Sequence, residues 1–537
     1  MTNRTFKTGT CREQPSFLPP RIEDYVGADN MVRAIDAYVD GCDLRRLGFR
    51  HSGYEGGAGQ PPYDPSDLLK LYLYGYLNRV RSSRSLERET QRNIEVMWLL
   101  KGLTPGYRTI GNFRKDNWTA LKAANREFVV LIRDLDLVGG TLVAIDGAFF
   151  DGNASKASIK SRKRLAEQAA AIDRDIEAYR SAVEAQDAAE TENSPAGDGG
   201  EGDRGDVAQQ IAGLMEKRAK VQADLARLEQ SGETQLSRTD ADARLLSKTG
   251  QVVAGYNVQI AVDEKHKLIV ASEVVNDGND KGQLYEVARA AKEALEVETL
   301  EAVADGGYYN GPALKECEDN KIVAYVPAPQ RTGREGRFTH EDFAYDAAEN
   351  VYRCPTGEVL RPTKTLKENG GRREIVYSSR KSSCDQCELR KRCLSAKGDT
   401  RTVNRWEHAD VLERHRERMK EADARLRLRQ RACLAEHPFG TLKCRAGYRH
   451  FLVRGFDKVR GEWSLMALCY NFSRVLSILG FQGFMEYLAQ RRAAWAILFA
   501  VSFVAATIGR ARAFVARFAA EITQNWWAIG LRVSFTR

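Results

Sequence analysis

The chain has 537 residues and carries 82 Lys and Arg against 73 Asp and Glu, a net charge of +9 at pH 7. This length supports at least one large hydrophobic core and about two to four domains. The ten cysteines are mostly scattered, which argues against a disulfide-built secreted scaffold and favours a reducing compartment. The modest basic excess permits nucleic-acid binding without requiring it.

The N-terminal part of the sequence predicts helices. Residues 1–14 contain no apolar stretch typical of a secretory signal, so we expect a cytoplasmic protein. Helical apolar spacing follows over residues 1–135, and the segment that begins PPYDPSDLLKLYLYGYL opens with proline and capping residues. The second half of this segment contains five arginines: Arg79, Arg81, Arg84, Arg88 and Arg92. We predict a helical DNA-binding domain over residues 1–135, with an ordinary solvated helical bundle as the alternative.

The pattern changes at residues 141–150, TLVAIDGAFF, where an apolar β-type run is interrupted by Asp146. Residues 160–235 are rich in Ala, Glu, Arg and Lys, and they predict a charged helical hairpin with a flexible linker. Residues 250–277 then predict an antiparallel strand pair around the turn DEKHK. The segment therefore begins a sheet with antiparallel strands and interrupts it with a helical insertion.

A helix, a short strand and a second acid follow this strand pair. The strand EAVA ends at Asp305, directly before two glycines, and a further helix and strand lead to Pro327. This order predicts an α/β fold with a mixed sheet over residues 136–330.

The remainder of the chain changes composition twice. Residues 331–404 are polar, with strand-like pieces and four clustered cysteines, and they predict a β-rich insertion. Residues 405–483 are predicted to be helical, and the basic segment 401–460 has 16 Lys and Arg against 8 Asp and Glu. Residues 484–537 form a divergent C-terminal tail. Its apolar run at 493–509 is at the short limit for a membrane span, and a buried helix is the preferred interpretation.

Three acids have unusual surroundings. Asp146 and Asp305 accompany apolar strands, where an unpaired buried carboxylate would be costly. Two such acids from one mixed sheet predict neighbouring carboxylates that a divalent cation would hold together. Glu436 lies in the basic helix and is the natural third ligand of a two-metal phosphoryl-transfer site, since basic neighbours suit a phosphodiester. An ordinary solvated glutamate is the alternative for Glu436.

Other acids are weaker candidates. Asp151 is five residues from Asp146, which places it on the opposite strand face, so Asp146 is preferred. Asp240 and Asp242 belong either to the edge of the site or to a polar loop. We interpret Asp263 and Asp280 as turn and cap residues.

Several long motifs carry a family resemblance. They are LVAIDGAFFDGNASK, GYNVQIAVDEKHKLIVASEVVNDGND, VADGGYYNGPALKECEDNKIVAYVP and EHPFGTLKCRAGYRHFLVRGFDKVRGEWSLMALCYNFSRV, preceded by SFLPPRIEDYVGADNMVRAIDAYVD. In this order they resemble the DDE transposases of bacterial insertion sequences, in the branch whose third acid lies in a Y-R-E-K helix. The resemblance covers most of the chain before the C-terminal tail.

The resemblance implies an RNase H-like catalytic core and a DNA transposase. Such an enzyme cleaves at the terminal inverted repeats of its element and joins the ends to target DNA, using Mg²⁺ with Mn²⁺ as a substitute. Asp146, Asp305 and Glu436 would then be both the catalytic residues and the metal ligands. The implied partners are double-stranded DNA and a second copy of the chain, in the cytoplasm on the bacterial nucleoid and away from membranes.

The remaining motif positions are matched in part. Lys443 takes the place of the motif lysine, whereas Arg429 and Ala432 stand where a tyrosine and an arginine are expected, and Arg431 is one residue away. We expect the basic and aromatic residues around Glu436 to bind DNA: Lys443, His437, Arg431, Arg445, Tyr448, Arg449 and Arg454.

The cysteine cluster is a separate signal. Cys384 and Cys387 form a CxxC pair, and Cys354 and Cys393 complete four thiols, so we predict a structural Zn²⁺ site with unmetallated thiols as the alternative. Two other functions remain open for the whole chain. One is an RNase H-like nuclease without strand transfer, and the other is a catalytically inactive, transposase-derived DNA-binding protein.

Overall fold

The computed structural model describes residues 21–56, 60–193, 201–248, 250–329, 336–369, 372–395 and 398–533. The chain divides into two compact units, of which one comprises Met1–Ala120 with Phe472–Arg537 and the other comprises Leu121–Asn471. Each unit is described separately below.

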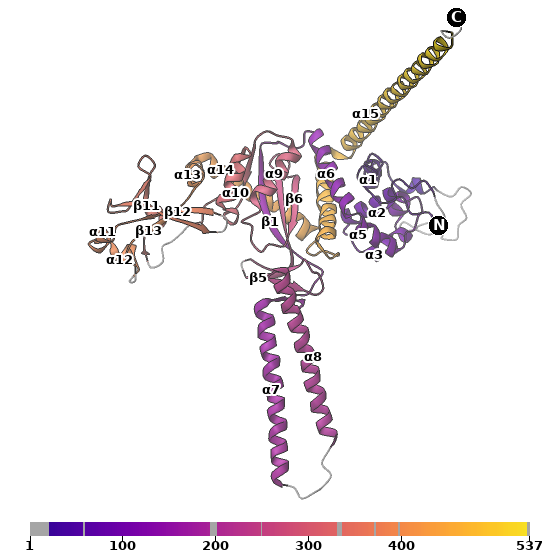
Figure 1. The fold of residues 1–537 in the computed structure, drawn as a ribbon. Coiled ribbons are helices and arrows are strands. Elements are labelled where there is room, and N and C mark those ends of the chain that lie inside the picture. The colour runs from indigo at the N-terminus through magenta and orange to yellow at the C-terminus, as the bar shows by residue number, and fades with distance from the viewer. Residues whose placement is uncertain are drawn as a thin grey trace, which may run out of the picture. The chain divides into compact units, whose positions relative to one another are not determined.

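Short helices make up the N-terminal part of the first unit (Figure 1). They are η1 (Ile22–Tyr25), α1 (Met31–Asp40), α2 (Pro65–Leu77), α3 (Ser83–Arg92), α4 (Ile94–Leu99) and α5 (Tyr107–Asp116), and α6 (Trp118–Asp134) follows. Capping side chains set where α1 and α2 begin: Asn30 accepts a hydrogen bond from the Val32 amide at 3.0 Å, and Asp64 accepts one from Ser66 at 2.7 Å. The helices predicted from the sequence are confirmed for the described residues.

A buried cation joins α1 to α2. The Lys70 side chain is 1% exposed, and its Nζ lies 2.6 Å from a carboxylate oxygen of Asp36 and 2.6 Å from one of Asp40. A buried ammonium is tolerated only with such partners, so this contact fixes the two helices against each other.

The arginines predicted to form a basic face are divided between core and surface. Arg81 is only 9% exposed. On α3, three arginines spaced four residues apart are exposed and form a stripe along one side of the helix: Arg84, Arg88 and Arg92. This stripe is the part of the predicted basic surface that a phosphate backbone could contact.

A six-stranded mixed sheet forms the centre of the second unit (Figure 1). Its strands are β1 (Leu142–Asp151), β4 (Arg244–Lys248), β5 (Gln251–Asp263), β6 (Ile269–Val275), β7 (Leu300–Val303) and β8 (Ile322–Tyr325). Their order is β4-β5-β1-β7-β8, and β6 also pairs with β5. β5 runs antiparallel to β1 and β6, whereas β7 is parallel to β1 and β8 is parallel to β7. The predicted mixed α/β sheet with an antiparallel start is confirmed.

Helices connect and cover this sheet. α9 (Leu284–Leu295) joins β6 to β7, and α10 (Gly311–Asp319) joins β7 to β8. A later helix, α14 (Ala422–Gly440), packs across β1 and β7, because Leu142, Ala144 and Val303 share one buried cluster with its residues. Side chains alternate between the two faces along a strand, so this cluster defines which face of β1 and β7 is covered by α14.

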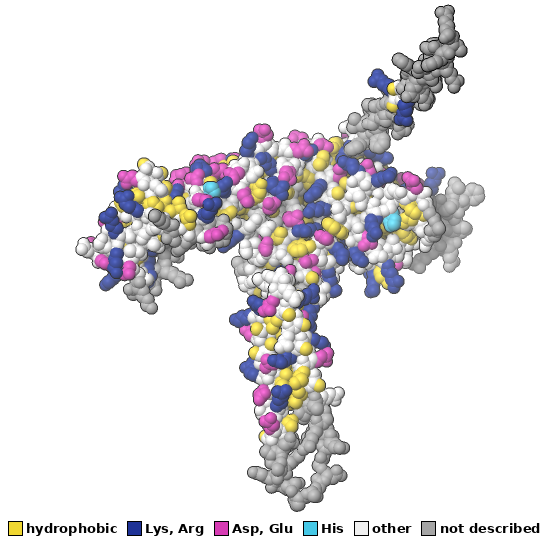
Figure 2. Space-filling model, viewed as in Figure 1, with side chains coloured by type: hydrophobic (Ala, Val, Ile, Leu, Met, Phe, Trp, Pro, Cys, Tyr) yellow, Lys and Arg dark blue, Asp and Glu magenta, His cyan; other side chains and the backbone are white. Residues whose placement is uncertain are grey.

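Two long helices lie between β1 and β5 in the sequence, as the charged segment predicts. α7 (Arg162–Asn193) and α8 (Glu201–Ser231) run antiparallel, with the short strands β2 (Ile159–Ser161) and β3 (Gln235–Ser237) paired at their base. Ion pairs cross between them, from Arg162 to Glu229 and from Arg218 to Asp173, each at 2.5 Å. Figure 2 shows basic, acidic and apolar side chains interspersed along this pair, which has no single-signed face in that view.

A second, five-stranded antiparallel sheet holds the cysteine cluster. Its order is β13-β12-β11-β10-β9, with the strands β9 (Ala344–Asp346), β10 (Val351–Arg353), β11 (Val359–Asn369), β12 (Arg372–Ser378) and β13 (Thr402–Trp406). The short helices α11 (Lys381–Asp385) and α12 (Arg390–Cys393) lie between β12 and β13. The strands expected in this polar region are therefore present.

The basic C-terminal helices are more broken than the sequence suggests. The segment does not become continuously helical at 405, because β13 extends to Trp406 and α13 (Ala409–Lys420) is separated from α14 by an extended residue, Glu421, with ψ 148°. A π-helical turn (Thr441–Arg445) follows α14. α15 (Phe456–Val533) then runs to the end of the described chain and is kinked at Gly480, whose φ is 71°.

One helical segment within the described residues, Phe456–Ala493, is long and apolar enough to cross a membrane. Of its most apolar window, 56% is buried in the structure, which is typical of a core helix. The apolar run 493–509 predicted to pack as a buried helix is helical, but its side chains from 494 onward lie outside the described residues.

His415 of α13 is a buried histidine. It is 1% exposed, and neither of its ring nitrogens has a hydrogen-bond partner among the described residues. Burial lowers the pKa of His415 to about 4, and the neighbouring Arg418 and Arg416 act in the same direction. The imidazole is therefore neutral in the folded protein at pH 7.

We expect this histidine to make the protein sensitive to acid. An unfolded histidine titrates near 6.5, so between about pH 6.5 and pH 4 the unfolded state binds more protons and stability falls as the pH is lowered. The loss amounts to roughly 3 kcal/mol at most. Urea unfolding at neutral pH and near the lower end of that window measures it. His415→Leu should lose this part of the pH dependence, and equal losses in the variant and the wild type would contradict the assignment.

Candidate active site at the β1–β7 strand ends

Asp146 and Asp305 belong to neighbouring strands. β1 pairs with β7 in parallel, and Ala144 lies opposite Val303. The same register continued by two residues sets Asp146 opposite Asp305, just past the end of β7. Adjacent strands are about 4.8 Å apart, so a register continued in this way would make the two acids neighbours across the sheet.

Both acids lie on the face covered by α14. Asp146 comes two residues after Ala144, and Asp305 comes two after Val303 with an extended backbone (φ −78°, ψ 171°). Residues at this spacing share one strand face, and Ala144 and Val303 pack in the cluster with α14. Glu436 directly follows Ala435, which belongs to the same cluster. The structure thus sets Asp146 and Asp305 on the face covered by α14, and Glu436 lies on α14 one residue after the packed Ala435.

Asp146 is held by its own backbone and by a cation. Its side chain is 17% exposed, and its Oδ1 accepts a hydrogen bond from the Gly147 amide at 2.9 Å. Its Oδ2 lies 3.7 Å from Nη1 of Arg431, which comes from α14. This nitrogen is buried and has no hydrogen-bond partner among the described residues. A positive charge is therefore already accommodated next to Asp146.

The other two acids differ in their surroundings. Asp305 is partly buried and accepts a hydrogen bond from the Gly307 amide at 2.8 Å, which stabilises the turn η3 (Gly306–Tyr308). Glu436 is exposed on α14. Within the described ranges, no three His, Cys, Asp or Glu side chains are arranged to hold a metal ion. The acids share one region of the molecule, but a coordination geometry is not formed there.

The donor set of this region nevertheless suits a hard divalent cation. Carboxylate oxygens are the ligands that Mg²⁺ prefers. Arg431 shows, by its buried guanidinium nitrogen beside Asp146, that the position tolerates a cation. The region therefore fits a metal-dependent reaction at a phosphate better than acid–base chemistry by a single carboxylate.

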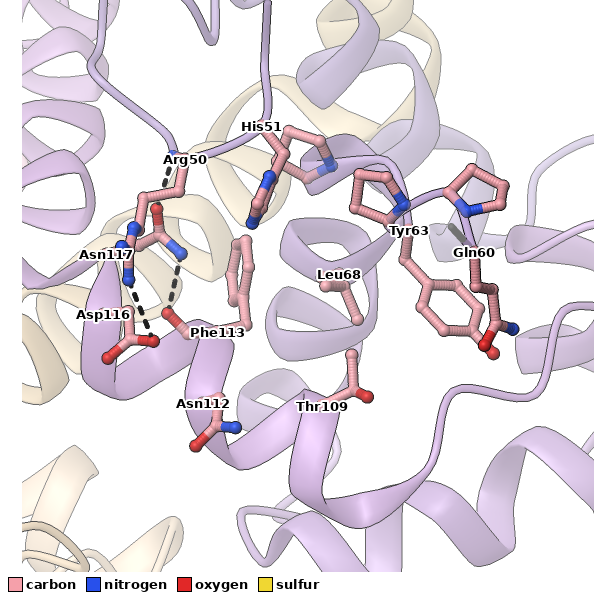
Figure 3. A pocket seen from close by; sticks show the side chains of 13 residues that line it. Arg50, His51, Gln60, Tyr63, Leu68, Thr109, Asn112, Phe113, Asp116 and Asn117 are labelled. Atoms are coloured by element: carbon pink, nitrogen blue, oxygen red, sulfur yellow. Dashed lines mark hydrogen bonds and ion pairs between the residues drawn. The ribbon is translucent and has the colours of Figure 1, made fainter. Parts of the chain in front are cut away.

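A separate pocket of about 360 Å³ lies in the first unit (Figure 3). Arg50 forms an ion pair with Asp116 at 3.2 Å, and its backbone amide donates to Asn117 at 2.7 Å. Asp116 is the one acid among the described residues that line the pocket, and Arg50 neutralises it. This pocket therefore lacks the paired carboxylates that phosphoryl transfer needs.

Two parts of the chain match known protein families. Residues 353–476 match a family model described as a transposase DDE domain, and residues 20–116 match one described as a transposase domain, DUF772. Both matched families are transposase domains, and they support a DDE-type transposase of the insertion-sequence type. The first match includes α14 with Glu436, whereas Asp146 and Asp305 precede it. No curated protein sequence matches the transposase.

In this transposase, Lys443 is turned toward β1. Its Nζ donates a hydrogen bond to the Phe149 carbonyl at 2.6 Å and lies 4.4 Å from the centre of the Phe150 ring. Burial lowers the pKa of Lys443, although Asp151 and Asp146 oppose that shift. The motif lysine therefore makes an internal contact close to the acids and is only partly exposed.

The other residues predicted to bind DNA are divided in the same way. Arg431 faces Asp146, and Tyr448 is 2% exposed. Nδ1 of His437 lies 2.9 Å from the Tyr470 hydroxyl of α15. Three arginines that follow α14 are exposed: Arg445, Arg449 and Arg454. These three are the exposed members of the predicted set, although Arg449 donates to the Lys443 carbonyl and Arg454 donates to Asn153.

The four cysteines of the predicted zinc site meet in space. They surround a cavity of about 30 Å³ and are all free thiols: Cys354, Cys384, Cys387 and Cys393. Burial raises the pKa of Cys393, and the other three thiols contribute to the rise while Arg401 opposes it. Sγ of Cys384 lies 3.0 Å from the Ser379 hydroxyl. The cluster is assembled, although its sulfur atoms are not arranged as a metal-binding group.

Asp240 and Asp242 support the start of α15. Asp240 accepts hydrogen bonds from the Tyr256 hydroxyl at 2.8 Å and from the Gly455 amide at 3.0 Å. Asp242 accepts one from the Phe456 amide at 2.9 Å. These contacts give both acids a structural role in joining the segment before β4 to α15.

The sequence did not identify one group of buried polar residues next to the acids. Asp263, by contrast, accepts a hydrogen bond from the Gly139 amide at 2.9 Å, as expected of a turn residue. Asp280, interpreted as a cap, instead accepts side-chain hydrogen bonds from Asn257 at 2.9 Å and Gln259 at 2.8 Å. Asn257 and Gln259 alternate with apolar residues in β5. The same alternation is found in a strand with one solvated face, so the sequence pattern does not indicate that these two residues are buried.

We predict that Lys443 contributes mainly to stability through its contact with β1. Lys443→Met should lower the free energy of unfolding by about 1–3 kcal/mol, because the Phe149 carbonyl loses its partner. Urea unfolding measures this loss. The exposed neighbour provides the control, since Arg445→Met should change stability by less than about 0.5 kcal/mol. Equal effects of the two substitutions would contradict the internal role.

Proposed function

We propose that this transposase cleaves DNA at the terminal inverted repeats of an insertion sequence and joins the freed ends to target DNA by metal-assisted phosphoryl transfer. The observation that carries the proposal is the register of β1 and β7, which pairs Ala144 with Val303 on the face covered by α14 and, continued by two residues, would set Asp146 opposite Asp305. Glu436 on α14 supplies the third carboxylate. Such a set of acids is what a two-metal site requires.

The topology of the sheet supports an RNase H-like core. The strands follow the spatial order β6-β5-β1-β7-β8, in which β5 alone runs against its neighbours. The first acid lies on the central strand β1, and the second follows the adjacent parallel strand β7. α14, the helix that carries the proposed third acid, packs on these strands.

Divalent metal ions, Mg²⁺ or Mn²⁺, are the proposed cofactors, and Asp146, Asp305 and Glu436 would hold them. When bound, such ions activate the attacking water or hydroxyl and stabilise the leaving oxygen. The protein contributes the fixed register that spaces the first two carboxylates. The Arg431 guanidinium neutralises Asp146. If a metal ion bound to this carboxylate, Arg431 would have to share the carboxylate with the ion or move away from it. Lys443 holds the segment after α14 against β1 beside the site.

Double-stranded DNA is the proposed partner. In each unit separately, exposed arginines are present: the stripe on α3 and the three that follow α14. Such residues bind phosphate groups without reading sequence. Because two element ends must be processed together, we propose that two copies of the chain act as a homodimer on DNA.

Substitution of the acids tests this proposal. Asp146→Asn, Asp305→Asn and Glu436→Gln should each reduce Mg²⁺-dependent cleavage of a duplex carrying the element end to background, because each removes a carboxylate ligand. The binding of the same duplex, measured by fluorescence anisotropy, should persist. Glu298→Gln, at the opposite end of β7 from Asp305, is the matched control and should cleave normally.

The outcomes separate the alternatives. Undiminished cleavage by Glu436→Gln would contradict the assignment of the third ligand. Cleavage without joining, in a strand-transfer assay with a donor end, would favour a nuclease. Binding without cleavage by the wild type in Mg²⁺ and in Mn²⁺ would favour an inactive DNA-binding protein.

The cysteine cluster is proposed to hold a structural Zn²⁺, and the common cavity and the four free thiols support this. A metal ion there would link the segment α11–α12 to the β10–β11 turn.

Metal analysis of the purified protein should find about one zinc per chain. Cys387→Ser should lose the zinc and destabilise the five-stranded sheet. Cys433→Ser, which alters an exposed cysteine outside the cluster, should retain the metal. Absence of stoichiometric zinc from the wild-type protein would refute this site.

A further inference from the structure

A chain of buried polar side chains, joined by hydrogen bonds, links β5 to the turn that follows Asp305. The Tyr308 hydroxyl donates a hydrogen bond to Oε1 of Gln259. Gln259 Nε2 in turn donates to Oδ1 of Asp280 at 2.8 Å, and Asn257 Nδ2 donates to the same oxygen at 2.9 Å. Asp280 is 6% exposed and the other three are fully buried. Polar groups so buried are stable only when they are hydrogen-bonded, so the chain is a rigid part of the core.

The middle of this chain lies against the residue that follows Asp146. Gln259 of β5 pairs directly with Gly147 of β1. A Cβ atom at Gly147 would clash with Gln259 Nε2 and would lie 2.9 Å from Oδ1 of Asp280. A glycine is therefore needed after Asp146, because the hydrogen-bonded amide and carboxylate fill the space of a side chain there.

The Tyr308 end of the chain lies in the turn that follows Asp305. Tyr308 is the last residue of that turn, and its ring is fully buried. Oδ2 of Asp280 lies 3.8 Å from the position that a Cβ at Gly307 would occupy. Asp280 thus approaches the backbone on both sides, next to the residue after Asp146 and near the turn after Asp305.

The charge environment defines the direction of the Tyr308 hydrogen bond. Burial raises the pKa of Tyr308, and Asp280, Asp146 and Asp305 add to the rise, with Arg431 opposing it. The hydroxyl therefore keeps its proton and acts as a donor to Gln259. These three carboxylates lie close enough to Tyr308 to influence it, which is a second indication that they are neighbours.

We propose that Tyr308, Gln259 and Asp280 are positioning residues, which fix the turn after Asp305 against β1 and thereby set the spacing of Asp146 and Asp305 for metal binding. This inference rests on the proposed function, because it concerns the same pair of acids. β7 ends at Val303, so Asp305 lies beyond the last paired residue of its strand. The tether through Tyr308 supplies the restraint that strand pairing no longer provides there.

The test compares two tyrosines that each lose only a hydroxyl. Tyr308→Phe should raise the Mn²⁺ concentration for half-maximal cleavage by about tenfold, as substitutions behind metal ligands do. It should reduce the rise in Tm that Mn²⁺ gives the DNA-free protein. It should also speed hydrogen exchange of the amides of Gly307 and Tyr308 without metal. Tyr256→Phe removes another buried hydroxyl from β5 and should leave the metal dependence and that exchange unchanged.

The outcomes that test the positioning role differ from the outcome that tests the proposed metal site. Equal shifts in metal dependence for the two variants would overturn the positioning role, because general loosening of the sheet would then explain both. Unchanged amide exchange at the turn in Tyr308→Phe would also overturn it. A wild-type protein that shows no Mn²⁺ effect on cleavage or on Tm would instead refute the metal site itself, while the exchange measurement would still report whether Tyr308 holds the turn.

Discussion

The parallel pairing of β1 with β7 is the constraint on which the proposed chemistry depends. Backbone hydrogen bonds fix the register up to Ala144 and Val303, and the same register continued by two residues would set Asp146 opposite Asp305, although 158 residues separate them in the sequence. Two carboxylates at this spacing repel each other unless a cation lies close. The folded chain supplies one such cation, the guanidinium of Arg431, from the helix that also carries Glu436. The sheet and α14 therefore determine where negative charge is concentrated and how it is balanced.

The support of this arrangement lies on both sides of the two strands. On one face, small and branched apolar residues let α14 pack closely on β1 and β7. On the other side, the hydrogen-bonded chain from Tyr308 to Asp280 occupies the space beside Gly147. Apolar packing positions the helix that carries the third acid, and buried hydrogen bonds restrain the turn after the second, so these two acids are held by different kinds of interaction.

Much of this fold follows from local sequence patterns, and the exceptions have physical reasons. Apolar runs of strand length predicted β1, β5 and β7 well, and two acids were visible because Asp146 interrupts the run of β1 and Asp305 follows that of β7. Asn257 and Gln259 were missed, since their alternation with apolar residues is the same whether a strand face meets water or a tyrosine hydroxyl. The inward turn of Lys443 was also hidden, because the sequence shows a basic helix but not the carbonyl of Phe149 that the lysine reaches. Both cases depend on contacts between distant segments, which spacing along the chain does not encode.

The central claim is that Asp146, Asp305 and Glu436 surround one metal site. Localised oxidative cleavage tests it most directly: Fe²⁺ replaces Mg²⁺ in the full-length protein, ascorbate and peroxide are added, and the resulting protein fragments are mapped. The account predicts cuts close to all three acids, with each set suppressed by excess Mg²⁺. Cuts near one or two of the acids but not the third, or cuts that Mg²⁺ does not suppress, would contradict a shared site.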